Sequence, residues 1–242
     1  MFLLAPLSFT SAQLKLGDKP NCLRTHCWIT STLMLKPNMA STEWVIPLES
    51  PFHIKGRQNN CGDKVNIGIM TVSDRASAGE YNDEGGPAIL EFLQEALASP
   101  AEIHYSCVAD DYQLIVKELI RLSDQVNCSV IVTTGGTGPA PRDVTPDATE
   151  FVCDKIMHGF GEQMRAISLK FVPTAILSRQ LGGIRGKCLI FNLPGRPKAI
   201  RETIDEIWRA VPYCVDLIGG PYIDTVQSVC DAFRPIKAKR NN

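Results

Sequence analysis

The sequence predicts an α/β protein in three layers, with helices on both faces of one mostly parallel sheet. Two apolar runs rich in β-branched residues, at 65–73 and 129–134, and an alternating run at 103–108 are separated by segments of helical spacing. Such alternation favours parallel strands joined by right-handed crossovers. The chain has 242 residues, 44% of them hydrophobic and 21% charged, which suffices for one sizeable core.

The first 63 residues show no sustained helical or strand periodicity, and we expect them to form an irregular, poorly ordered extension. Turn signals such as Asn59-Asn60-Cys61-Gly62 interrupt them. Met39 is an alternative start, and the frequent Ser and Thr leave an organellar transit peptide as a weaker interpretation. We therefore divide the chain into this extension, a main domain at 64–235 and a basic tail at 236–242.

The first half of the main domain alternates strand and helix. Residues 65–73 (VNIGIMTVS) are typical of a strand buried on both faces. Helical spacing follows at 89–97, an alternating strand at 103–108 and a second helix at 115–122. A second buried strand at 129–134 ends in glycines.

The second half is predicted to contain a β-hairpin and a long helix. Residues 174–180 and 187–192 flank a glycine-rich segment at 182–186, which favours two antiparallel strands joined by a turn. Apolar residues at helical spacing over 200–211 mark one face of a helix. Pro212 should kink or end that helix, because proline has no backbone N–H to donate to a helical hydrogen bond.

Net charge and cysteine spacing argue against several classes of protein: nucleic-acid-binding, membrane-associated and disulfide-rich proteins. A net charge of −1 gives no electrostatic reason to bind nucleic acid or an anionic membrane. The nine cysteines contain no C-x-x-C pair, which favours buried free thiols in a reducing compartment over a disulfide framework. No apolar run approaches the ~18 residues of a membrane-spanning helix, and no secretory signal pattern is present. We expect a cytoplasmic protein.

A glycine-rich loop after the third predicted strand is a candidate phosphate-binding site. It contains Gly135, Gly136, Thr137 and Gly138. We expect a helix to follow with Thr145 as its N-cap, so that exposed N–H groups face the loop. The G-K-[ST] ending of a P-loop is absent, and a glycine-rich turn alone is more often a surface turn. Arg142 and Asp143 in the same loop favour a ligand site.

Two aspartates at predicted strand ends are candidates for binding Mg²⁺. Asp110 follows the second strand and Asp143 lies in the loop after the third. Because the carboxyl ends of parallel strands meet at one edge, these carboxylates should lie close together. Hard oxygen ligands suit Mg²⁺, which neutralises charge in phosphate chemistry. A structural alternative for Asp110 stays open, since its spacing to Gln113 resembles a capping box at the next helix.

Two other loops are expected at the same edge. Ser73, Asp74 and Asp83 follow the first strand. Pro194-Gly195 leads from a strand into the next helix and could cradle another anion. The structural alternatives are an ordinary polar loop for the first and a tight turn for the second.

Together these loops resemble the MogA/MoaB/gephyrin G-domain family of molybdenum cofactor biosynthesis. The matching stretches follow the family's order and spacing and are VSDRASAGEYNDEGGPA, TTGGTGPAPRDVTPDAT, GFGEQMRAISLKFVPTAILSRQ and NLPGRPKAI. They cover Val65 to about Pro235, and the third stretch particularly resembles bacterial MogA. The resemblance implies that the main domain is a molybdopterin-binding catalytic domain.

The resemblance implies a molybdopterin adenylyltransferase, which converts ATP and molybdopterin to adenylyl-molybdopterin and pyrophosphate. The family's two essential aspartates fall on Asp110 and Asp143, as catalytic and Mg²⁺-binding residues. The residues implied around the nucleotide and pterin are Gly135, Gly136, Thr137, Gly138, Ser73, Asp74, Asp83, Arg142, Pro194 and Gly195. The family also implies a homotrimer and leaves room for a molybdenum-insertion partner protein.

Other functions stay open at this point. The nearest is a MoaB-like molybdopterin-binding protein with the same fold and a different or lost activity. A non-catalytic trimeric binding module is a second, although the presence of both aspartates argues against a purely structural role. An unrelated nucleotide hydrolase is disfavoured because the P-loop lysine is missing. The extension before residue 64 has no counterpart in the compact bacterial enzymes.

Overall fold

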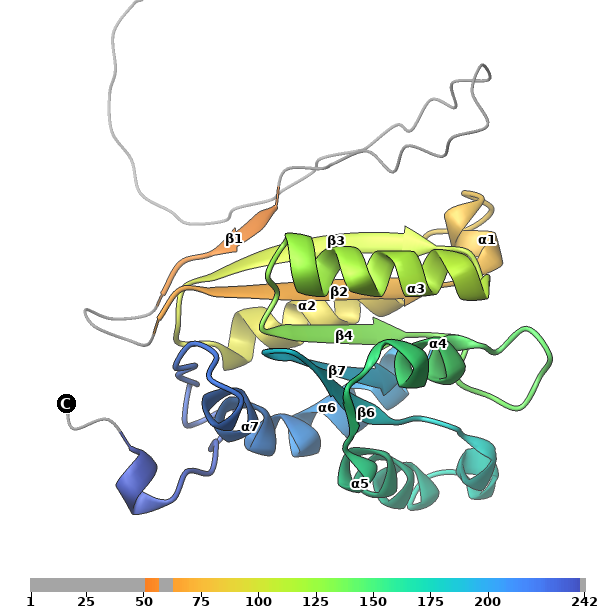
Figure 1. The fold of residues 1–242 in the computed structure, drawn as a ribbon. Helices are drawn as coiled ribbons and strands as arrows, with labels where there is room; N and C mark the ends of the chain where they lie inside the picture. The colour runs from red at the N-terminus through yellow and green to blue at the C-terminus, as the bar shows by residue number, and fades with distance from the viewer. Residues whose placement is uncertain (1–50, 57–62, 240–242) are drawn as a thin grey trace, which may run out of the picture. The chain divides into compact units, whose positions relative to one another are not determined.

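A computed structural model describes residues 51–56 and 63–239, which form a seven-stranded sheet with helices on both faces (Figure 1). The strand order is β1-β3-β2-β4-β7-β6-β5. The parallel strands are β2 (Val65–Val72), β3 (Ala101–Val108), β4 (Val130–Thr134) and β7 (Cys188–Leu193). Antiparallel pairing adds β1 (Phe52–Ile54), β6 (Gly182–Arg185) and β5 (Lys155–Ile156). The predicted mostly parallel α/β fold is confirmed.

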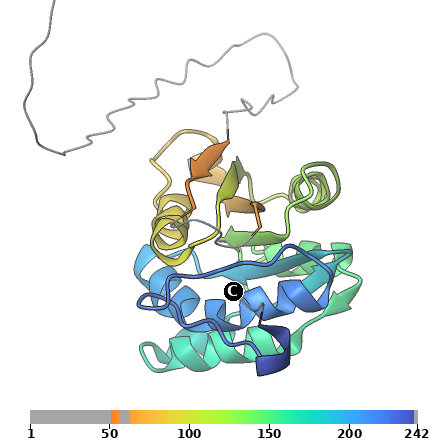
Figure 2. The same cartoon turned by 90° about the vertical axis from the view of Figure 1, so that its left-hand side faces the viewer.

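Helices cover the sheet from two sides, as the view turned by 90° shows with α2 and α3 on opposite sides (Figure 2). The helices packed on one face are α2 (Gly85–Ala96), α5 (His158–Leu169), α6 (Pro197–Ile207) and α7 (Val211–Leu217). The other face carries α3 (Tyr112–Ile120) and α4 (Thr145–Val152). A short helix, α1 (Asp74–Ser77), follows β2. Within the described residues, no helix is both long and apolar enough to cross a bilayer.

The central strands are mostly apolar because both of their faces are buried, and their buried polar side chains, Thr71, Thr133, Thr134 and Asn192, lie toward the carboxyl ends. In β4, Val130 and Val132 belong to the core beneath α2 and α6, whereas Ile131 belongs to the core beneath α3 and α4. All three side chains are fully buried. Successive strand side chains point to opposite faces, so a strand covered on both sides favours apolar residues at consecutive positions.

The predicted hairpin exists, but its first arm lies elsewhere. Residues 174–180 were expected to form a strand, whereas Pro173–Leu177 is a 3₁₀ turn and the strand is Gly182–Arg185. Gly182 and Gly183 therefore lie within the strand, whereas Gly186 lies in the turn as expected, with φ +55°. A Cβ on Gly183 would come within 2.5 Å of the Cys153 sulfur, so glycine is required there by close packing rather than by a turn.

The long C-terminal helix is interrupted as predicted. α6 ends at Ile207, a 3₁₀ turn spans Trp208–Ala210, and α7 begins at Val211 with Pro212 in its first turn. Proline is tolerated in a first turn because its missing N–H has no helical partner there. The break therefore precedes Pro212.

Two short strands were not predicted: the two-residue β5, and β1, which lies inside the supposed extension. Phe52 pairs with Ile103 on the edge of β3, and only three residues take part, too few to show an alternating pattern. At the other end, Ile236–Ala238 forms a short 3₁₀ turn within the predicted basic tail. The domain boundaries stay a prediction, and the alternative start at Met39 lies outside the described residues.

We expect Gly183→Ala to destabilise the protein by about 1–3 kcal/mol, because an added methyl group must displace Cys153 in a packed layer. Urea unfolding followed by circular dichroism measures this. Gly159→Ala in α5 is the matched control, since nothing lies within 4 Å of its Cβ position. Alanine favours a helix over glycine by up to about 1 kcal/mol, so the control should be neutral or stabilised. Equal losses in both variants would contradict the packing explanation.

Candidate active site

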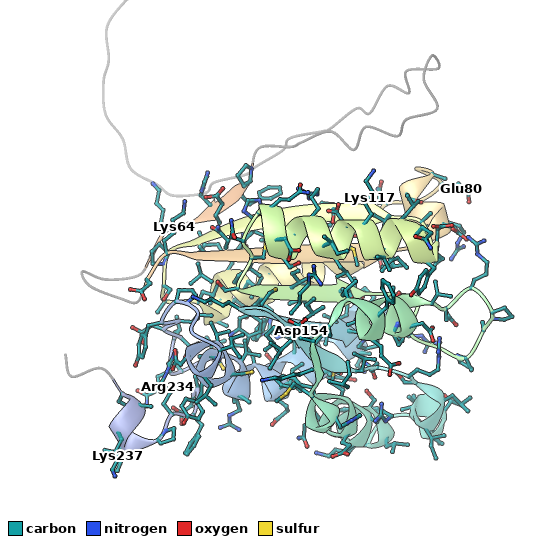
Figure 3. The ribbon with its side chains drawn as sticks, viewed as in Figure 1. Lys64, Glu80, Lys117, Asp154, Arg234 and Lys237 are labelled. Carbon is teal, nitrogen blue, oxygen red and sulfur yellow. The ribbon has the colours of Figure 1, made fainter. Side chains whose placement is uncertain are left out.

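The carboxyl ends of β2, β3, β4 and β7 meet at one edge of the sheet, and the loops that follow all four carry predicted site residues. In Figure 3, Glu80 in the loop after β2 lies near this edge, and Lys64 lies at the opposite edge. Open parallel sheets bind ligands beyond the carboxyl ends of their strands. The topology therefore places the candidate site here.

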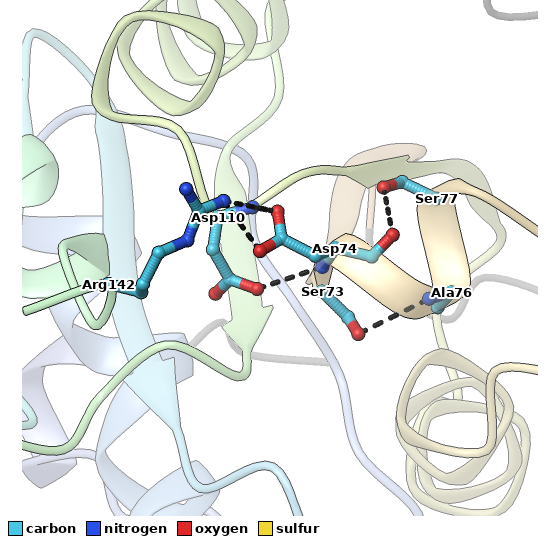
Figure 4. Close-up of polar contacts among 6 residues, drawn as sticks. All are labelled: Ser73, Asp74, Ala76, Ser77, Asp110 and Arg142. Carbon is cyan, nitrogen blue, oxygen red and sulfur yellow. Dashed lines mark hydrogen bonds and ion pairs between the residues drawn. The ribbon is translucent and has the colours of Figure 1, made fainter. Parts of the chain in front are cut away.

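Asp74 and Asp110 join the loops after β2 and β3. The Asp74 backbone N–H donates to Asp110 Oδ2 at 2.8 Å, and the Asp110 N–H donates to Asp74 Oδ1 at 3.0 Å. Arg142, from the loop after β4, donates through Nη2 to both oxygens of Asp74, at 2.6 and 2.5 Å (Figure 4). Three predicted site residues from three different loops thus form one charged cluster.

The capping alternative for Asp110 is wrong, because the neighbouring aspartate caps α3. Asp111 Oδ1 accepts from the N–H groups of Gln113 and Leu114, both at 3.0 Å. Two donors at the first turn of a helix satisfy the usual N-cap requirement. The Asp110 carboxylate is left to face the charged cluster.

Burial raises the pKa of Asp110, and the negative charges of Asp74 and Asp143 raise it further. The Asp74 backbone hydrogen bond and the Arg142 charge oppose this rise in pKa. A cation placed among these carboxylates would relieve their repulsion.

No group of three or more His, Cys, Asp or Glu side chains among the described residues is arranged to hold a metal ion by itself. Mg²⁺ usually takes only one or two carboxylates, with waters and substrate phosphates completing its shell. Asp110 and Asp143 have the donor chemistry that such a partial site needs, and their assignment as Mg²⁺ ligands stays a prediction.

The glycine-rich loop lies directly against the end of β2. Gly135 has φ +97°, and a Cβ there would lie 2.2 Å from the Val72 carbonyl oxygen. Gly136 has φ +60°, and a Cβ there would lie 2.4 Å from Thr145 Oγ1. Both positions combine positive φ with close backbone approach, which excludes other residues.

The helix after this loop begins one residue earlier than predicted. α4 starts at Thr145 with Val144 as its N-cap, and the Val144 carbonyl accepts from the Ala148 N–H at 3.0 Å. The Thr145 N–H donates to the Gly136 carbonyl at 3.1 Å. This bond sets the path of the chain, so the Thr145 hydroxyl does not cap the helix and lies buried without a hydrogen-bond partner.

The Pro194-Gly195 turn and Ser73 also lie at this edge. Thr134 Oγ1 donates to the Pro194 carbonyl at 2.8 Å, which places the turn against the start of the glycine-rich loop. Ser73 caps α1, accepting from the Ala76 N–H at 3.3 Å (Figure 4). The Ser73 side chain therefore has a structural task in addition to any contact with a ligand.

Asp83 lies at the same edge, but its carboxylate is already satisfied. Its Oδ2 accepts from Thr71 Oγ1 and from the Tyr105 hydroxyl, both at 2.8 Å, and from the Gly86 N–H at 2.9 Å. Its Oδ1 accepts from the Gly85 N–H at 3.0 Å. Asp83 thus anchors the start of α2 to β2 and β3, and direct contact with a ligand stays a prediction.

Sequence reasoning missed two residues of this edge. Tyr105 supports Asp83, and its burial raises the pKa of the phenol well above its usual range. Arg179 reaches the loop that carries Asp143 from 36 residues away in the sequence. Arg179 lies inside the quoted stretch GFGEQMRAISLKFVPTAILSRQ, but nothing local in that stretch indicates which loop it touches.

Two hollows in the described residues lie away from this edge. One of 650 Å³ lies beside Arg209 and Phe233, and one of 380 Å³ lies beside Arg185 and Lys187. Neither is lined by a predicted site residue. We base the site on the converging loops, because the charged cluster and the glycine-rich loop lie there.

Comparison with known proteins points to one family. The model of a probable molybdopterin binding domain matches residues 68–213. The molybdopterin adenylyltransferase of Helicobacter pylori J99 is 56% identical over 171 residues, covering 71% of this chain and 97% of that protein. That of Escherichia coli K12 is 51% identical over 187 residues, covering 72% and 96%. The crystal structure of the molybdopterin biosynthesis enzyme MoaB from Thermus thermophilus superimposes with a TM-score of 0.60 at 39% identity, covering 65% and 99%.

We expect the Asp110→Asn variant to become more stable relative to the unsubstituted protein as pH rises above about 3.8, which is the ordinary pKa of an aspartate side chain. The raised pKa means that the folded state holds the Asp110 proton more tightly than the unfolded state does, so ionisation costs stability as pH rises. Urea unfolding between pH 4 and 7 measures the difference.

Asp147→Asn is a control of opposite sign. The hydrogen bond from Arg179 lowers the pKa of Asp147, so ionised Asp147 stabilises the fold and this stability is lost as pH falls below 3.8, which urea unfolding continued below pH 4 measures. A stability difference for Asp110→Asn that stays constant or falls with rising pH would show that the carboxyl is not destabilised in its ionised form.

Proposed function

The chain belongs to the molybdopterin adenylyltransferase family, and we propose that it transfers AMP from ATP to the terminal phosphate of molybdopterin. The products are adenylyl-molybdopterin and pyrophosphate. The observation that carries this proposal is the meeting of Asp74, Asp110 and Arg142 beside a glycine-rich loop at one edge of the sheet. The enzyme is a nucleotidyltransferase, and its proposed catalytic residues are Asp110 and Asp143.

The reaction needs alignment and charge control more than proton transfer. An oxygen of the molybdopterin phosphate attacks the α-phosphorus of ATP, a new P–O bond forms, and the bond to the β-phosphate breaks with its electrons leaving on pyrophosphate. The attacking oxygen is already ionised near neutral pH. Positioning and stabilisation of the developing charge therefore supply most of the rate.

The nucleotide phosphates are proposed to lie over Gly135–Gly138 at the start of α4. N–H groups of a glycine-rich turn and of a helix N-terminus favour anions. Arg142 is 65% exposed and pairs with Asp74, so its guanidinium is accessible to a phosphate entering the edge. In this proposal Arg142 exchanges one anionic partner for another when ATP binds.

Mg²⁺ is the proposed cofactor, with Asp110 and Asp143 as its protein ligands. When bound, the ion would neutralise charge on the reacting phosphates and pyrophosphate. The raised pKa of Asp110 is consistent with this assignment: burial is its main cause, and the negative charges of Asp74 and Asp143, which a cation would offset, add to it. Ser73, Asp74, Asp83, Pro194 and Gly195 are proposed to border the nucleotide and the pterin.

The proposed assembly is a homotrimer in the cytoplasm. The family resemblance implies the trimer, and exposed apolar side chains between α5 and β6 offer a surface for it, with Phe171, Ile176 and Leu177 each more than half exposed. The cysteines of the described residues are free thiols, which suits a reducing compartment. A molybdenum-insertion protein is the proposed downstream partner.

We expect purified protein supplied with ATP, Mg²⁺ and molybdopterin to release pyrophosphate, and release to depend on the pterin. Asp143→Asn and Asp110→Ala should each lower kcat by about 10²–10³-fold, because each removes charge that organises the transition state. Pterin affinity, measured by fluorescence titration, should change far less. Turnover of Asp143→Asn within a few-fold of the unsubstituted enzyme would refute its assigned role.

A second candidate is a molybdopterin-binding protein without transferase activity, favoured by the likeness to a structure named MoaB. The same assay separates the two. Pterin binding with no pterin-dependent pyrophosphate release would support the second candidate and exclude adenylyl transfer.

A further inference from the structure

The guanidinium of Arg179 binds several positions along the loop between β4 and α4. Arg179 Nε donates to the Gly138 carbonyl at 3.0 Å, and Nη2 donates to the Asp143 carbonyl. Nη1 and Nη2 also donate to the two carboxylate oxygens of Asp147, both at 2.8 Å. A single side chain therefore binds the start of the loop, its aspartate and the first turn of the following helix.

The backbone that presents this guanidinium is itself held in place. The Arg179 N–H donates to the Thr137 carbonyl at 2.9 Å. The Gln180 side chain is buried and donates to the Asn192 carbonyl at 3.3 Å, at the end of β7. Arg165 of α5 donates to the Gln180 carbonyl at 2.7 Å. The arginine thus projects from a fixed point rather than from a free loop.

Close packing of α5 completes this support. A Cβ on Gly161 would lie 2.5 Å from the Gln180 carbonyl oxygen, so only glycine lets α5 approach this closely. Gly161, Arg165, Arg179 and Gln180 all lie in the stretch GFGEQMRAISLKFVPTAILSRQ. The residues of this stretch therefore hold the backbone that positions Arg179 against the loop.

The part of the loop around Asp143 makes few other hydrogen bonds to the rest of the fold. The Asp143 carboxylate accepts from the Ala140 N–H at 3.1 Å, and the Asp143 N–H donates to the Ala140 carbonyl at 2.9 Å, so both bonds stay inside the loop. Two side chains join this turn to other parts of the fold: Arg142 pairs with Asp74, and Arg179 is the one that binds the backbone carbonyls of Gly138 and Asp143. The planar fork of a guanidinium fixes several acceptors at once, which a lysine cannot do.

We propose that Arg179 is a positioning residue for adenylyl transfer, which sets the place of Asp143 by holding the backbone of its loop at Gly138 and Asp143. The inference rests on the proposed function. The bonds to the two backbone carbonyls carry the effect, because an ion pair as exposed as that between Arg179 and Asp147 contributes little alone.

Steady-state kinetics of Arg179→Ala and Arg179→Lys test the proposal. Loss of such a support typically costs ten- to a hundredfold in activity, so we expect kcat of Arg179→Ala to fall by about that factor while the KM for ATP changes less than about threefold. Arg179→Lys should recover kcat only in part, because an ammonium group cannot reach all these acceptors together. Asp147→Ala should reduce kcat less than Arg179→Ala, since it leaves the carbonyl bonds intact.

Arg185→Ala is the matched control. Arg185 makes the same kind of contacts at another place, with both oxygens of Asp124 at 2.9 and 2.6 Å and with the Val152 carbonyl at 2.9 Å. Its removal should cost comparable stability and leave kcat unchanged. A similar fall in kcat for Arg185→Ala and Arg179→Ala would overturn the proposal, because the effect would then be general destabilisation.

Hydrogen exchange followed by mass spectrometry supplies a readout that does not need activity. Amides of 135–147 should exchange faster in Arg179→Ala than in the unsubstituted protein and in Arg185→Ala. Gly161→Ala should show the same acceleration, with Gly159→Ala as its control. Unchanged exchange in Arg179→Ala would overturn the positioning role even if the enzyme is active. Lack of pyrophosphate release by the unsubstituted protein would refute the proposed function and leave the exchange result to decide how the loop is held.

Discussion

Parallel pairing of β2, β3, β4 and β7 is the constraint on which the site depends. Because these strands share one direction, the loops after all four emerge at one edge, although they lie up to about 120 residues apart in the chain. The central strands β2, β4 and β7 are mostly apolar and buried on both faces, and the predicted site residues lie in the loops that follow them. The buried sheet supplies rigidity, and the loops supply the chemistry.

Gathering negative side chains at one edge has an electrostatic cost, and the structure offsets it in two ways. Arg142 pairs with Asp74, and backbone N–H groups donate to the carboxylates of Asp74 and Asp110. The pKa of Asp110 nevertheless remains raised, first because the carboxyl is buried and then because Asp74 and Asp143 carry negative charge. This residual repulsion suits a site that receives both a cation and phosphates, because binding relieves it.

The loop that carries Asp143 gains its shape from distant segments. Its glycines fit against Val72 and Thr145, and Arg179 fastens it from the region after α5. A precise active-site loop needs such outside supports, since turns held only by their own hydrogen bonds open easily. The same logic explains Asp83, whose four hydrogen bonds tie the start of α2 to two strands.

Strand and helix order, the catalytic edge and the roles assigned to Asp110 and Asp143 could be proposed from the sequence, because apolar periodicity and loop chemistry are local signals. The three-residue β1 is too short to show such a signal, and Gly182 and Gly183 look like a turn until Phe160 and Cys153 are seen against them. Tertiary structure alone decided that Asp110 bonds to Asp74, that Asp83 is satisfied by Thr71 and Tyr105, and that Arg179 reaches the loop. A sequence pattern records neighbours along the chain, whereas these contacts join segments that only the folded sheet brings together.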